Sequence, residues 1–509
     1  MGSIAPISTF RTKAATMCNL CALTQTFDPG RHVGEEDVTI GNLPLPGGND
    51  EGGAVETPPL PYGSLTELAS YLTSGYWEDG GSSAHSFAAT VGEISAHVIT
   101  VDLTALTSTG QRLARWALDS WEQVADLHFT EVTRGGDITF DDSDSGAYST
   151  SSFDEDGNTL AATVNISQDW LATYGTTLAS YSMTTFVHEI GHALGLGHLG
   201  NYNGSTGTQI YANDSWQLSV MSYIAQSENS NVSADYAFPS GPMMADIVAI
   251  QSLYGTPIES DDGDSTWGQG GTYSRYFTTL FASITDPTIE PIAFTIYDVG
   301  GTDMLDLSGS RTADVVNLNA GGFSNVAGHI GNLAIASGTV IENIKVGRGN
   351  DTVYGNAADN VIRGQTGWDL LHGGSGRDRI FGGMGRDTIS GDAGNDRLFG
   401  KKGHDWLDGG EGNDILFGGL GRDTFFYGFG HDADIIRDFD LDLDKLAFSA
   451  LDFGNTDAET LVKTYGRLVD QGIRLDFSDS VILGADTNDR LTLSGVYDLD
   501  ALVDDIIFV

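Results

Sequence analysis

The C-terminal third of the chain repeats itself every nine residues. Between Val346 and Phe426, nearly every unit begins with glycine, and each carries aspartate or asparagine at the sixth position and an apolar residue at the eighth. A unit this short cannot bury its apolar residue alone, so neighbouring units have to stack and share a core. The repeat therefore confines this region to a pile of short parallel strands joined by glycine turns. The eighth positions are Val353, Ile362, Leu371, Ile380, Ile389, Leu398, Leu407, Leu416 and Phe425.

The sixth position of the repeat predicts a metal. The pattern G-G-x-G-x-D-x-U-x is a calcium-binding nonapeptide, in which glycine turns bare backbone carbonyls and aspartate supplies the hard, charged oxygen that Ca²⁺ prefers. Two units should bind Ca²⁺ weakly or not at all, because Asn360 replaces the acid in one, and Lys401 and Lys402 occupy the turn of another. A disordered linker is the alternative, but a linker needs no inward-facing residue in every unit. The candidate calcium ligands are Asp351, Asp369, Asp378, Asp387, Asp396, Asp405, Asp414 and Asp423.

A second pattern lies nearer the middle of the chain, which reads H-E-x-x-H-x-x-G-x-x-H from His188 onward. On a helix, His188 and His192 share one face, so both imidazoles can reach a single tetrahedral Zn²⁺. Gly195 lets the helix end and the chain turn, which brings His198 round as a third ligand. Three protein ligands leave one position open, as catalytic zinc sites do, and Glu189 is placed to act as the catalytic base. A helix with two exposed histidines is the alternative.

Residues 219–223 read S-V-M-S-Y. With the long histidine motif, this segment resembles the Met-turn of the metzincin endopeptidases, and its wording is similar to that of the serralysin branch. The resemblance implies an α+β metzincin-like catalytic domain followed by an all-β parallel β-roll or β-sandwich domain. It also implies that Met221 forms an apolar floor beneath the metal and that Tyr223 is a further, movable zinc ligand. The alternative is an ordinary core methionine and a half-buried tyrosine.

The charge of the chain restricts its partners. The 509 residues include 70 acidic and 24 basic ones, for a formal net charge of −46. We therefore expect no nucleic-acid partner and no anionic membrane partner, and no apolar run is long enough for a membrane span. Without Ca²⁺ the repeats should repel themselves and stay unfolded, so the fold is expected to form in calcium-rich surroundings. We expect a monomer.

The expected location is extracellular. The start of the chain lacks the apolar stretch and cleavage site of a secretory signal. The last five residues, 505–509, are an acidic residue followed by apolar ones. This ending is similar to the uncleaved C-terminal signal of repeat-in-toxin proteins, which a type I secretion apparatus exports in one step. A final β-strand explains the same ending equally well.

Composition and resemblance together divide the chain. The elements that we expect include helices over 103–126, 184–196 (the zinc helix) and 246–255, and a sheet edge over 146–150 beside the zinc cleft. The divisions are a propeptide or linker (1–62), a zinc metalloprotease catalytic domain (63–257), a calcium-binding β-roll (258–430, with the nonapeptides at 346–426) and a C-terminal β cap with the secretion signal (431–509).

The two cysteines, Cys18 and Cys21, both lie in the expected propeptide. A reversible disulfide between them is one interpretation. The other is autoinhibition in a zymogen, in which a propeptide thiolate occupies the open zinc position, because sulfur binds Zn²⁺ well.

The sequence thus favours a secreted, serralysin-type zinc endopeptidase that acts on proteins and peptides. The bound peptide is expected to add as a strand to the sheet edge near Ala147 and Tyr148. One rival is a calcium-dependent repeat-in-toxin surface or adhesive protein with a vestigial protease site. Another is a repeat-in-toxin lipase, but the chain shows no convincing G-x-S-x-G nucleophile motif.

Overall fold

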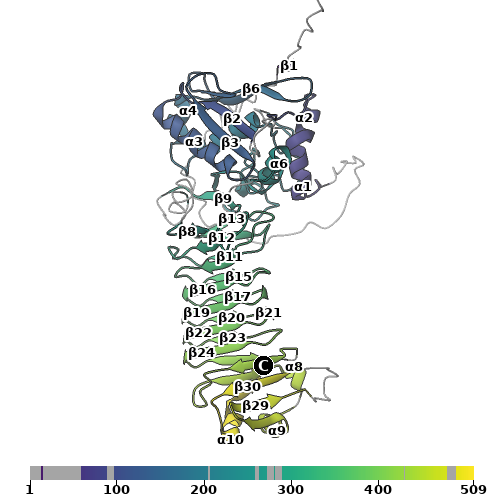
Figure 1. Cartoon of the computed structure of the whole chain (residues 1–509), viewed down its shortest axis with the longest axis vertical. Helices are drawn as coiled ribbons and strands as arrows, with labels where there is room; N and C mark the ends of the chain where they lie inside the picture. Colours follow the sequence, from purple (N-terminus) through teal and green to yellow (C-terminus); the bar gives the residue numbers. More distant parts are fainter. Residues whose placement is uncertain are drawn as a thin grey trace, which may run out of the picture.

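A mixed α/β region is followed by a long stack of strands in the computed structural model of the chain (Figure 1). This arrangement confirms the fold class that the sequence predicts. The C-terminal part is dominated by parallel pairing, as expected for a β-roll. The residues that the structure describes are 13–14, 59–88, 97–203, 207–257, 263–271, 280, 289–428, 430–454, 456–478 and 489–509.

A six-stranded sheet with the order β1-β5-β6-β4-β2-β3 lies at the top of Figure 1. The strands β2, β3, β4 and β6 run parallel, and β5 pairs antiparallel with β6. The two-residue β1 pairs antiparallel with the end of β5, at Ser152 and Phe153. The sheet edge expected over 146–150 therefore belongs to β5. The strands are β1 (Lys13–Ala14), β2 (His97–Asp102), β3 (Leu127–Val132), β4 (Ile138–Asp141), β5 (Ala147–Phe153) and β6 (Thr159–Ile166).

Helix α3 (Ser108–Glu122) packs against the zinc helix and is shorter than the expected 103–126. The hydroxyl of Thr107 accepts a hydrogen bond from the amide of Gly110 and thereby caps the helix after the chain has made a separate turn. Trp121 is fully buried and its indole N–H donates to the carbonyl of Val187. The cap, which a periodic pattern does not reveal, sets the start of this helix.

Helix α5 (Tyr181–Ala193) carries the first two histidines and is buried from Ser182 to its end. Ser180 caps it, so the helix begins three residues before the expected 184–196. Gly195 follows with φ +106, which is the left-handed turn that the sequence predicts there. The other helices of this region are α1 (Leu65–Ser70), the π-helix η2 (Tyr71–Gly75), α2 (Tyr76–Asp79), α4 (Gln168–Tyr174), the 3₁₀ helix η3 (Gln226–Glu228) and α6 (Met244–Tyr254).

The roll consists of an eleven-stranded and a twelve-stranded sheet, and each coil gives one strand to each. Ile362 pairs with Ile380, Ile380 with Leu398, and Leu398 with Leu416, so one coil spans two nonapeptides. Every eighth-position residue is at most 2% exposed, which confirms the inward-facing position. The strands of the repeats are β15 (Thr352–Tyr354), β16 (Val361–Thr366), β17 (Leu370–His372), β18 (Ser375–Gly376), β19 (Arg379–Gly385), β20 (Thr388–Ser390), β21 (Ala393–Gly394), β22 (Arg397–Gly403), β23 (Trp406–Asp408), β24 (Ile415–Gly421) and β25 (Thr424–Tyr427).

Further strands and short helices close the roll at both ends. The last strand, β31, pairs parallel with β27 and forms one edge of the twelve-stranded sheet. Above the repeats lie β7 (Phe238–Pro239), β8 (Thr266–Gly268), β9 (Ile292–Ile296), β10 (Met304–Asp306), β11 (Val315–Asn317), β12 (Phe323–Val326), β13 (His329–Ile335) and β14 (Asn343–Lys345). Below them lie β26 (Ala433–Ile436), β27 (Lys445–Phe448), α8 (Ala450–Phe453), α9 (Ala458–Tyr465), β28 (Gly466–Val469), β29 (Gly472–Asp476), β30 (Arg490–Ser494), α10 (Leu499–Leu502), η4 (Val503–Asp505) and β31 (Ile506–Phe508).

Across the described ranges, no helix combines the length and the apolar composition that crossing a membrane requires.

Candidate zinc centre and calcium ladder

Three imidazoles converge at the C-terminal end of α5. Nε2 of His192 lies 3.1 Å from Nε2 of His188 and 3.0 Å from Nε2 of His198. In a tetrahedral site with Zn–N bonds of about 2.0–2.1 Å, neighbouring ligand nitrogens lie about 3.3 Å apart. The three nitrogens therefore fit one ion between them. In the described part of the chain, this is the one group of three or more His, Cys, Asp or Glu side chains whose ligand atoms lie within 4.8 Å of one another.

Backbone carbonyls orient the first two rings. Nδ1 of His188 lies 2.8 Å from the carbonyl oxygen of Val220, and Nδ1 of His192 lies 2.7 Å from that of Leu196. Because each Nδ1 donates its proton to a carbonyl, each Nε2 keeps a lone pair for a metal. Burial lowers the pKa of His188 to about 4 and lowers the pKa of His192 and His198 well below the usual range. The triad is thus neutral at physiological pH, as metal ligands must be.

Glu189 is completely buried beside the triad. Neither of its carboxylate oxygens has a hydrogen-bond partner among the described residues. Desolvation raises the pKa of Glu189 well above its ordinary value. A buried, unpaired carboxylate is costly, and a dication held by the neighbouring imidazoles would offset that cost and favour the ionised form. The buried carboxyl group is therefore consistent with a Zn²⁺ ion bound by the neighbouring imidazoles.

The segment after the third histidine packs directly under α5. Met221 is fully buried, and a Cβ built on Gly191 would lie 2.7 Å from its Sδ atom. Gly191 separates the two ligands of the helix, so Met221 contacts α5 at the level of the triad, as expected of a Met-turn.

A buried carboxylate that we did not single out as a site residue fixes this turn. Asp246, at the start of α6, accepts hydrogen bonds from the hydroxyl of Ser219 at 2.6 Å, from the amide of Val220 at 2.7 Å and from the amide of Met243 at 2.9 Å. Burial raises its pKa to about 7 in spite of these bonds. The carbonyl of Val220 orients His188, and Asp246 holds the amide of the same Val220. Asp246 therefore supports the triad indirectly, through Val220.

Tyr223 lies beside the triad. Its ring centre is 4.5 Å from that of His198 and 5.8 Å from that of His188. Its neighbour Tyr202 stacks on it with ring centres 4.7 Å apart and planes within 23°. The position is compatible with the metal-ligand role that the resemblance implies, and that role remains a prediction.

A buried hydrogen-bond cluster holds the backbone of Tyr223. Its amide donates to the Tyr202 hydroxyl, which in turn lies 3.0 and 3.1 Å from the two carboxylate oxygens of Asp214. The hydroxyl of Ser222 also donates to Asp214, at 2.6 Å. Asp214 is fully buried, and desolvation raises its pKa to about 6. Tyr202 and Asp214 were not predicted from the sequence, because no local pattern joins them to the histidine motif.

A cavity of about 130 Å³ opens next to His192. Tyr76 and Trp77 form aromatic parts of its wall, and Ser149 and Ser151 of β5 line it from the sheet side. The hydroxyl of Ser149 is buried and has no hydrogen-bond partner within the described ranges. The cavity therefore joins the edge strand to the triad.

The aspartates of the repeats form two ladders along the roll. In each ladder the amide of one aspartate or asparagine donates to Oδ1 of the residue 18 positions later, as Asp369 does to Asp387 at 3.1 Å and Asp378 does to Asp396 at 2.8 Å. The second oxygen, Oδ2, is buried and has no partner among the described residues. This holds for Asp351, Asp369, Asp378, Asp387, Asp396, Asp405, Asp414 and Asp423, which are all the predicted calcium ligands.

The unpaired oxygens face spaces next to the turn glycines. A Cβ built on Gly364 would lie 2.6 Å from both Oδ2 of Asp369 and the carbonyl oxygen of Gly382. Ca²⁺ binds carboxylate and carbonyl oxygens. The donor types therefore suit Ca²⁺, and calcium binding at these positions stays a prediction. The same pair of a carboxylate oxygen and a glycine carbonyl adjoins Gly373, Gly391 and Gly400.

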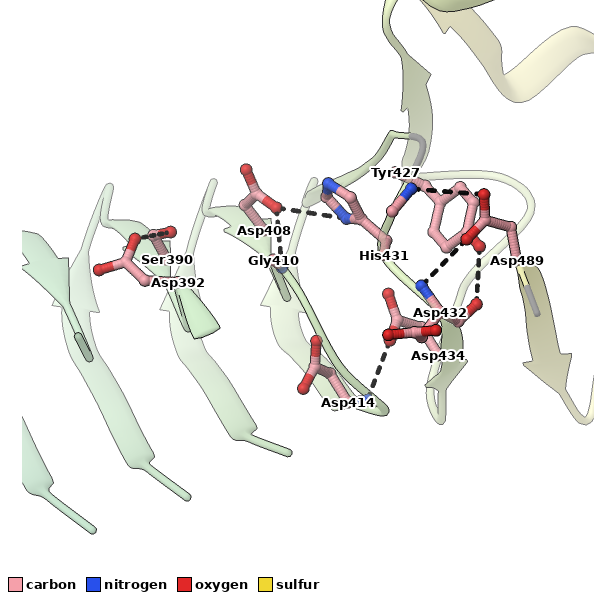
Figure 2. A network of polar contacts seen from close by, with 11 residues as sticks. Ser390, Asp392, Asp408, Gly410, Asp414, Tyr427, His431, Asp432, Asp434 and Asp489 are labelled. Carbon is pink, nitrogen blue, oxygen red and sulfur yellow. Dashed lines mark hydrogen bonds and ion pairs between the residues drawn. The ribbon is translucent and has the colours of Figure 1, made fainter. Parts of the chain in front are cut away.

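One ladder ends in two close carboxyl groups (Figure 2). The amide of Asp414 donates to Oδ1 of Asp434 at 2.9 Å. Burial raises the pKa of both groups. Repulsion from Asp414 adds to the rise at Asp434, and repulsion from Asp396 adds to the rise at Asp414. Just before Asp434 in the chain, the amides of Gly430 and Asp432 donate hydrogen bonds to the carboxylate of Asp489. The ladder is therefore anchored in the segment after the repeats.

The two atypical repeats differ from each other. The side-chain amide of Asn360 donates to the carbonyl of Glu342 and to Oδ1 of Asn356, so it closes its own turn. In the other repeat, the ammonium group of Lys401 lies over the ring of Phe399, 4.8 Å from its centre. Weak calcium binding at these two repeats stays a prediction. Cys18 and Cys21, the predicted inhibitory ligands, lie outside the described residues.

Comparisons with known proteins cover both halves of the chain. Residues 93–220 match the Matrixin family, and residues 258–482 match the family described as Peptidase M10 serralysin C terminal. The chain is 37% identical over 268 residues to the metallopeptidase AprA of Pseudomonas marginalis, covering 49% of this chain and 54% of that one. It is 40% identical over 259 residues to Serralysin C of Dickeya chrysanthemi (47% and 51%). It is 34% identical over 273 residues to the serralysin of Proteus mirabilis (49% and 54%).

The chain spans about half the length of the curated relatives that it matches. The first family match contains the histidine motif, and the second contains the nonapeptide repeats. The structure brings the histidines of the first match into one cluster and builds the second match into a roll. Sequence, fold and site agree: residues 93–220 match the Matrixin family, residues 258–482 match the serralysin C-terminal family of M10 peptidases, and the chain is similar to serralysins.

Proposed function

We propose that the protein is a zinc-dependent endopeptidase that cleaves peptide bonds within protein substrates. The observation that carries this proposal is the neutral imidazole triad of His188, His192 and His198 with the buried, unpaired carboxylate of Glu189 beside it. A structural zinc site would need a fourth protein ligand and no base. The rival, a surface protein with a vestigial site, gives no reason to keep that carboxylate buried and unpaired.

The chemistry divides between the metal and the chain. A bound Zn²⁺ would acidify water and polarise the scissile carbonyl. The carboxylate of Glu189 takes the proton from the attacking water and later delivers it to the departing amine nitrogen. The carbonyls of Val220 and Leu196 keep the imidazoles in the required tautomer throughout. Tyr223, which stands beside His198, donates a hydrogen bond to the oxyanion that develops on the substrate.

The substrate binds in an extended conformation along β5. On its outer side this strand pairs, among the described strands, with the two-residue β1 alone, which adds to its end at Ser152 and Phe153 in the manner of a bound strand. Ser149 and Ser151 point from the same strand into the cavity beside His192. A substrate side chain near the scissile bond would enter this cavity, where Tyr76 and Trp77 supply apolar walls.

Ca²⁺ stabilises the roll in this proposal. Each predicted ligand offers one buried oxygen without a partner, and desolvation raises the pKa of Asp369 to about 8 and that of Asp378 to about 7. Ions between the coils would remove the repulsion among these groups and favour their ionised form. The proposal keeps the four divisions of the chain, with boundaries at 62, 257 and 430. Residues 63–257 would bind zinc, and residues 258–430 would bind calcium.

The protein acts outside the cell and is made as a zymogen. Its relatives include several serralysins, and a fold that depends on Ca²⁺ suits calcium-rich surroundings. We further propose that a type I apparatus exports the protein through the C-terminal residues 505–509. Cys18 or Cys21 would control the zymogen, and the protein would be a monomer.

The decisive experiment compares the full chain with its Glu189→Gln variant, both loaded with Zn²⁺ and Ca²⁺. Casein hydrolysis should fall by about 10²–10⁴-fold in the variant, because the base is lost. Zinc content, measured by mass spectrometry of the native protein, should stay at one ion per chain. The control is Glu155→Gln, which changes an exposed carboxylate and should leave the rate unchanged. Full activity of Glu189→Gln, or an inert wild-type protein with zinc bound, would reject the proposal.

A further inference from the structure

One face of the roll carries a charge opposite to that of the chain. The strands β16, β19, β22 and β24 of the eleven-stranded sheet contain no acidic residue. The strands β17, β20, β23 and β25 of the other sheet contain no lysine or arginine. In a chain with 70 acidic and 24 basic residues, this separation is informative. We call the first surface the basic face, and it consists of Arg363, Arg379, Phe381, Arg397, Phe399, Lys401, Lys402 and Phe417.

An aromatic row runs along the middle of the basic face. Phe381, Phe399 and Phe417 are register neighbours, with ring centres 4.8 and 4.9 Å apart and planes within 10° and 8°. Arg363 and Arg379 lie over the ring of Phe381, at 5.6 and 5.8 Å. A cation on an aromatic ring keeps its charge and its hydrogen-bond donors, so it can still bind an anion.

The cations of the basic face lack acidic partners. Among the described residues, none of its arginines or lysines forms an ion pair. Its neighbours do: Lys345, the register neighbour of Arg363 in β14, pairs with Asp306, and Arg377, outside the face, pairs with Asp359. The outer members Arg379, Arg397 and Lys401 are exposed. Arg379 and Arg397 are register neighbours, so their charges recur along the roll at the strand spacing of about 4.8 Å.

Lys401 occupies a backbone position that favours glycine. Its φ is +79, and its register neighbours in the adjacent coils are Gly383, with φ +118, and Gly419, with φ +99. A lysine in the left-handed region is strained, as is Gln365 with φ +67 in the same register column, and of these two residues only Lys401 adds a charge to the basic face.

We propose that the basic face binds a linear acidic polysaccharide, which lies lengthwise along the roll. Regularly spaced carboxylate or sulfate groups would pair with the cations, and the half-buried edges of the phenylalanine row would contact the apolar parts of the sugars. Single-stranded nucleic acid fits less well, because its bases need free ring faces for stacking, and here each ring covers its neighbour. Binding would hold the protein on an acidic matrix without involving the zinc site.

The test uses the full calcium-loaded chain and hyaluronan as the probe, with dextran as the neutral control, and measures affinity at low salt. The triple variant Arg379→Gln, Arg397→Gln, Lys401→Gly should bind hyaluronan about tenfold more weakly or worse. The matched control, Arg377→Gln, Arg386→Gln, Arg422→Gln, removes the same charge from the turns and should change affinity by less than about twofold. Wild-type affinity should fall as salt rises.

Lys401→Gly alone separates binding from folding. It should weaken binding and leave the melting temperature equal or higher, because glycine relieves the left-handed strain. The proposal is overturned if wild-type protein ignores hyaluronan, if the control triple variant loses as much affinity as the face variant, or if single-stranded DNA binds more tightly than hyaluronan.

Discussion

The catalytic region and the roll differ in how fully their metal ligands are positioned and hydrogen-bonded without the ion. In the catalytic region, a continuous core and two backbone carbonyls hold His188 and His192 in place before any ion arrives. In the roll, each ladder aspartate has one oxygen engaged and one left buried and unpaired. Zinc would therefore bind to ligands that the fold has already positioned, whereas calcium would be needed for the roll to fold.

Calcium withdrawal should give the largest effect, and this effect should be confined to the roll. Without Ca²⁺, residues 346–426 are expected to lose their amide protection, because the unpaired carboxylates repel one another and the core of the roll is narrow. Hydrogen exchange in EGTA measures this, and α3 and α5 should keep more protection than the roll. Removal of zinc alone should leave both regions protected. Equal protection of the roll with and without Ca²⁺ would contradict the comparison.

Acid should partly replace calcium in the roll. The ladder aspartates have raised pKa values in the ion-free fold, about 8 for Asp369, about 7 for Asp378 and about 6 for Asp387, because burial disfavours their charge. A raised folded pKa means that the fold takes up protons, so its contribution to stability is complete below about pH 4 and is lost as the pH rises through 6 to 8. Calcium-free protein should therefore melt at a higher temperature at pH 5 than at pH 8.

The same measurement with saturating Ca²⁺ is the control. Ligation favours ionised carboxylates, so the calcium-loaded roll should gain stability from pH 5 to pH 8, and the slope should change sign. A calcium-free melting temperature that rises with pH would show that these carboxyl groups do not govern the roll.

Tyr202→Phe should lower catalysis without removing the metal. The variant keeps the ring that stacks on Tyr223 but loses the hydroxyl that accepts the amide of Tyr223 and bonds Asp214. We expect kcat to fall about tenfold while KM and zinc content stay constant, because Tyr223 would be misplaced in the transition state only. Steady-state kinetics on a peptide substrate and metal analysis measure this. Tyr211→Phe, which packs on Tyr71 away from the triad, is the control.

Asn360→Asp should give the smallest effect and tests whether a carboxylate at this ladder position adds a calcium site. The side chain would exchange its internal hydrogen bonds for a carboxylate in the ladder position. We expect a higher calcium stoichiometry by calorimetry and a rise in melting temperature of about 2–4 °C at fixed Ca²⁺. Asn395→Asp, an exposed turn change, should alter neither quantity.

The chain's local patterns predict the triad and the roll because their chemistry depends on short spacings. A four-residue step on a helix aligns His188 and His192, and a nine-residue period aligns the core of the roll. Helix limits were less accurate, since the caps at Thr107 and Ser180 override the apolar period. Element type is therefore easier to predict than element ends.

The supporting residues could not be predicted from local patterns. Asp246 lies 26 residues from Val220, and Asp214 lies 12 residues from Tyr202, so their contacts exist only in the folded molecule. In the sequence, Asp246 is an ordinary acid in the first turn of a helix. A buried carboxylate becomes recognisable as a support only when its partners are known.

The ladders also give the roll a direction. Each amide is accepted by an aspartate that comes later in the chain, and the last acceptors, Asp434 and Asp444, lie beyond the repeats. Backbone amides such as that of Leu370 donate the other way, to the preceding coil, so each coil is bonded to both of its neighbours. Removal of the closing segment would leave the amides of Asp414 and Asp423 without their carboxylate acceptors at the lower end of the roll.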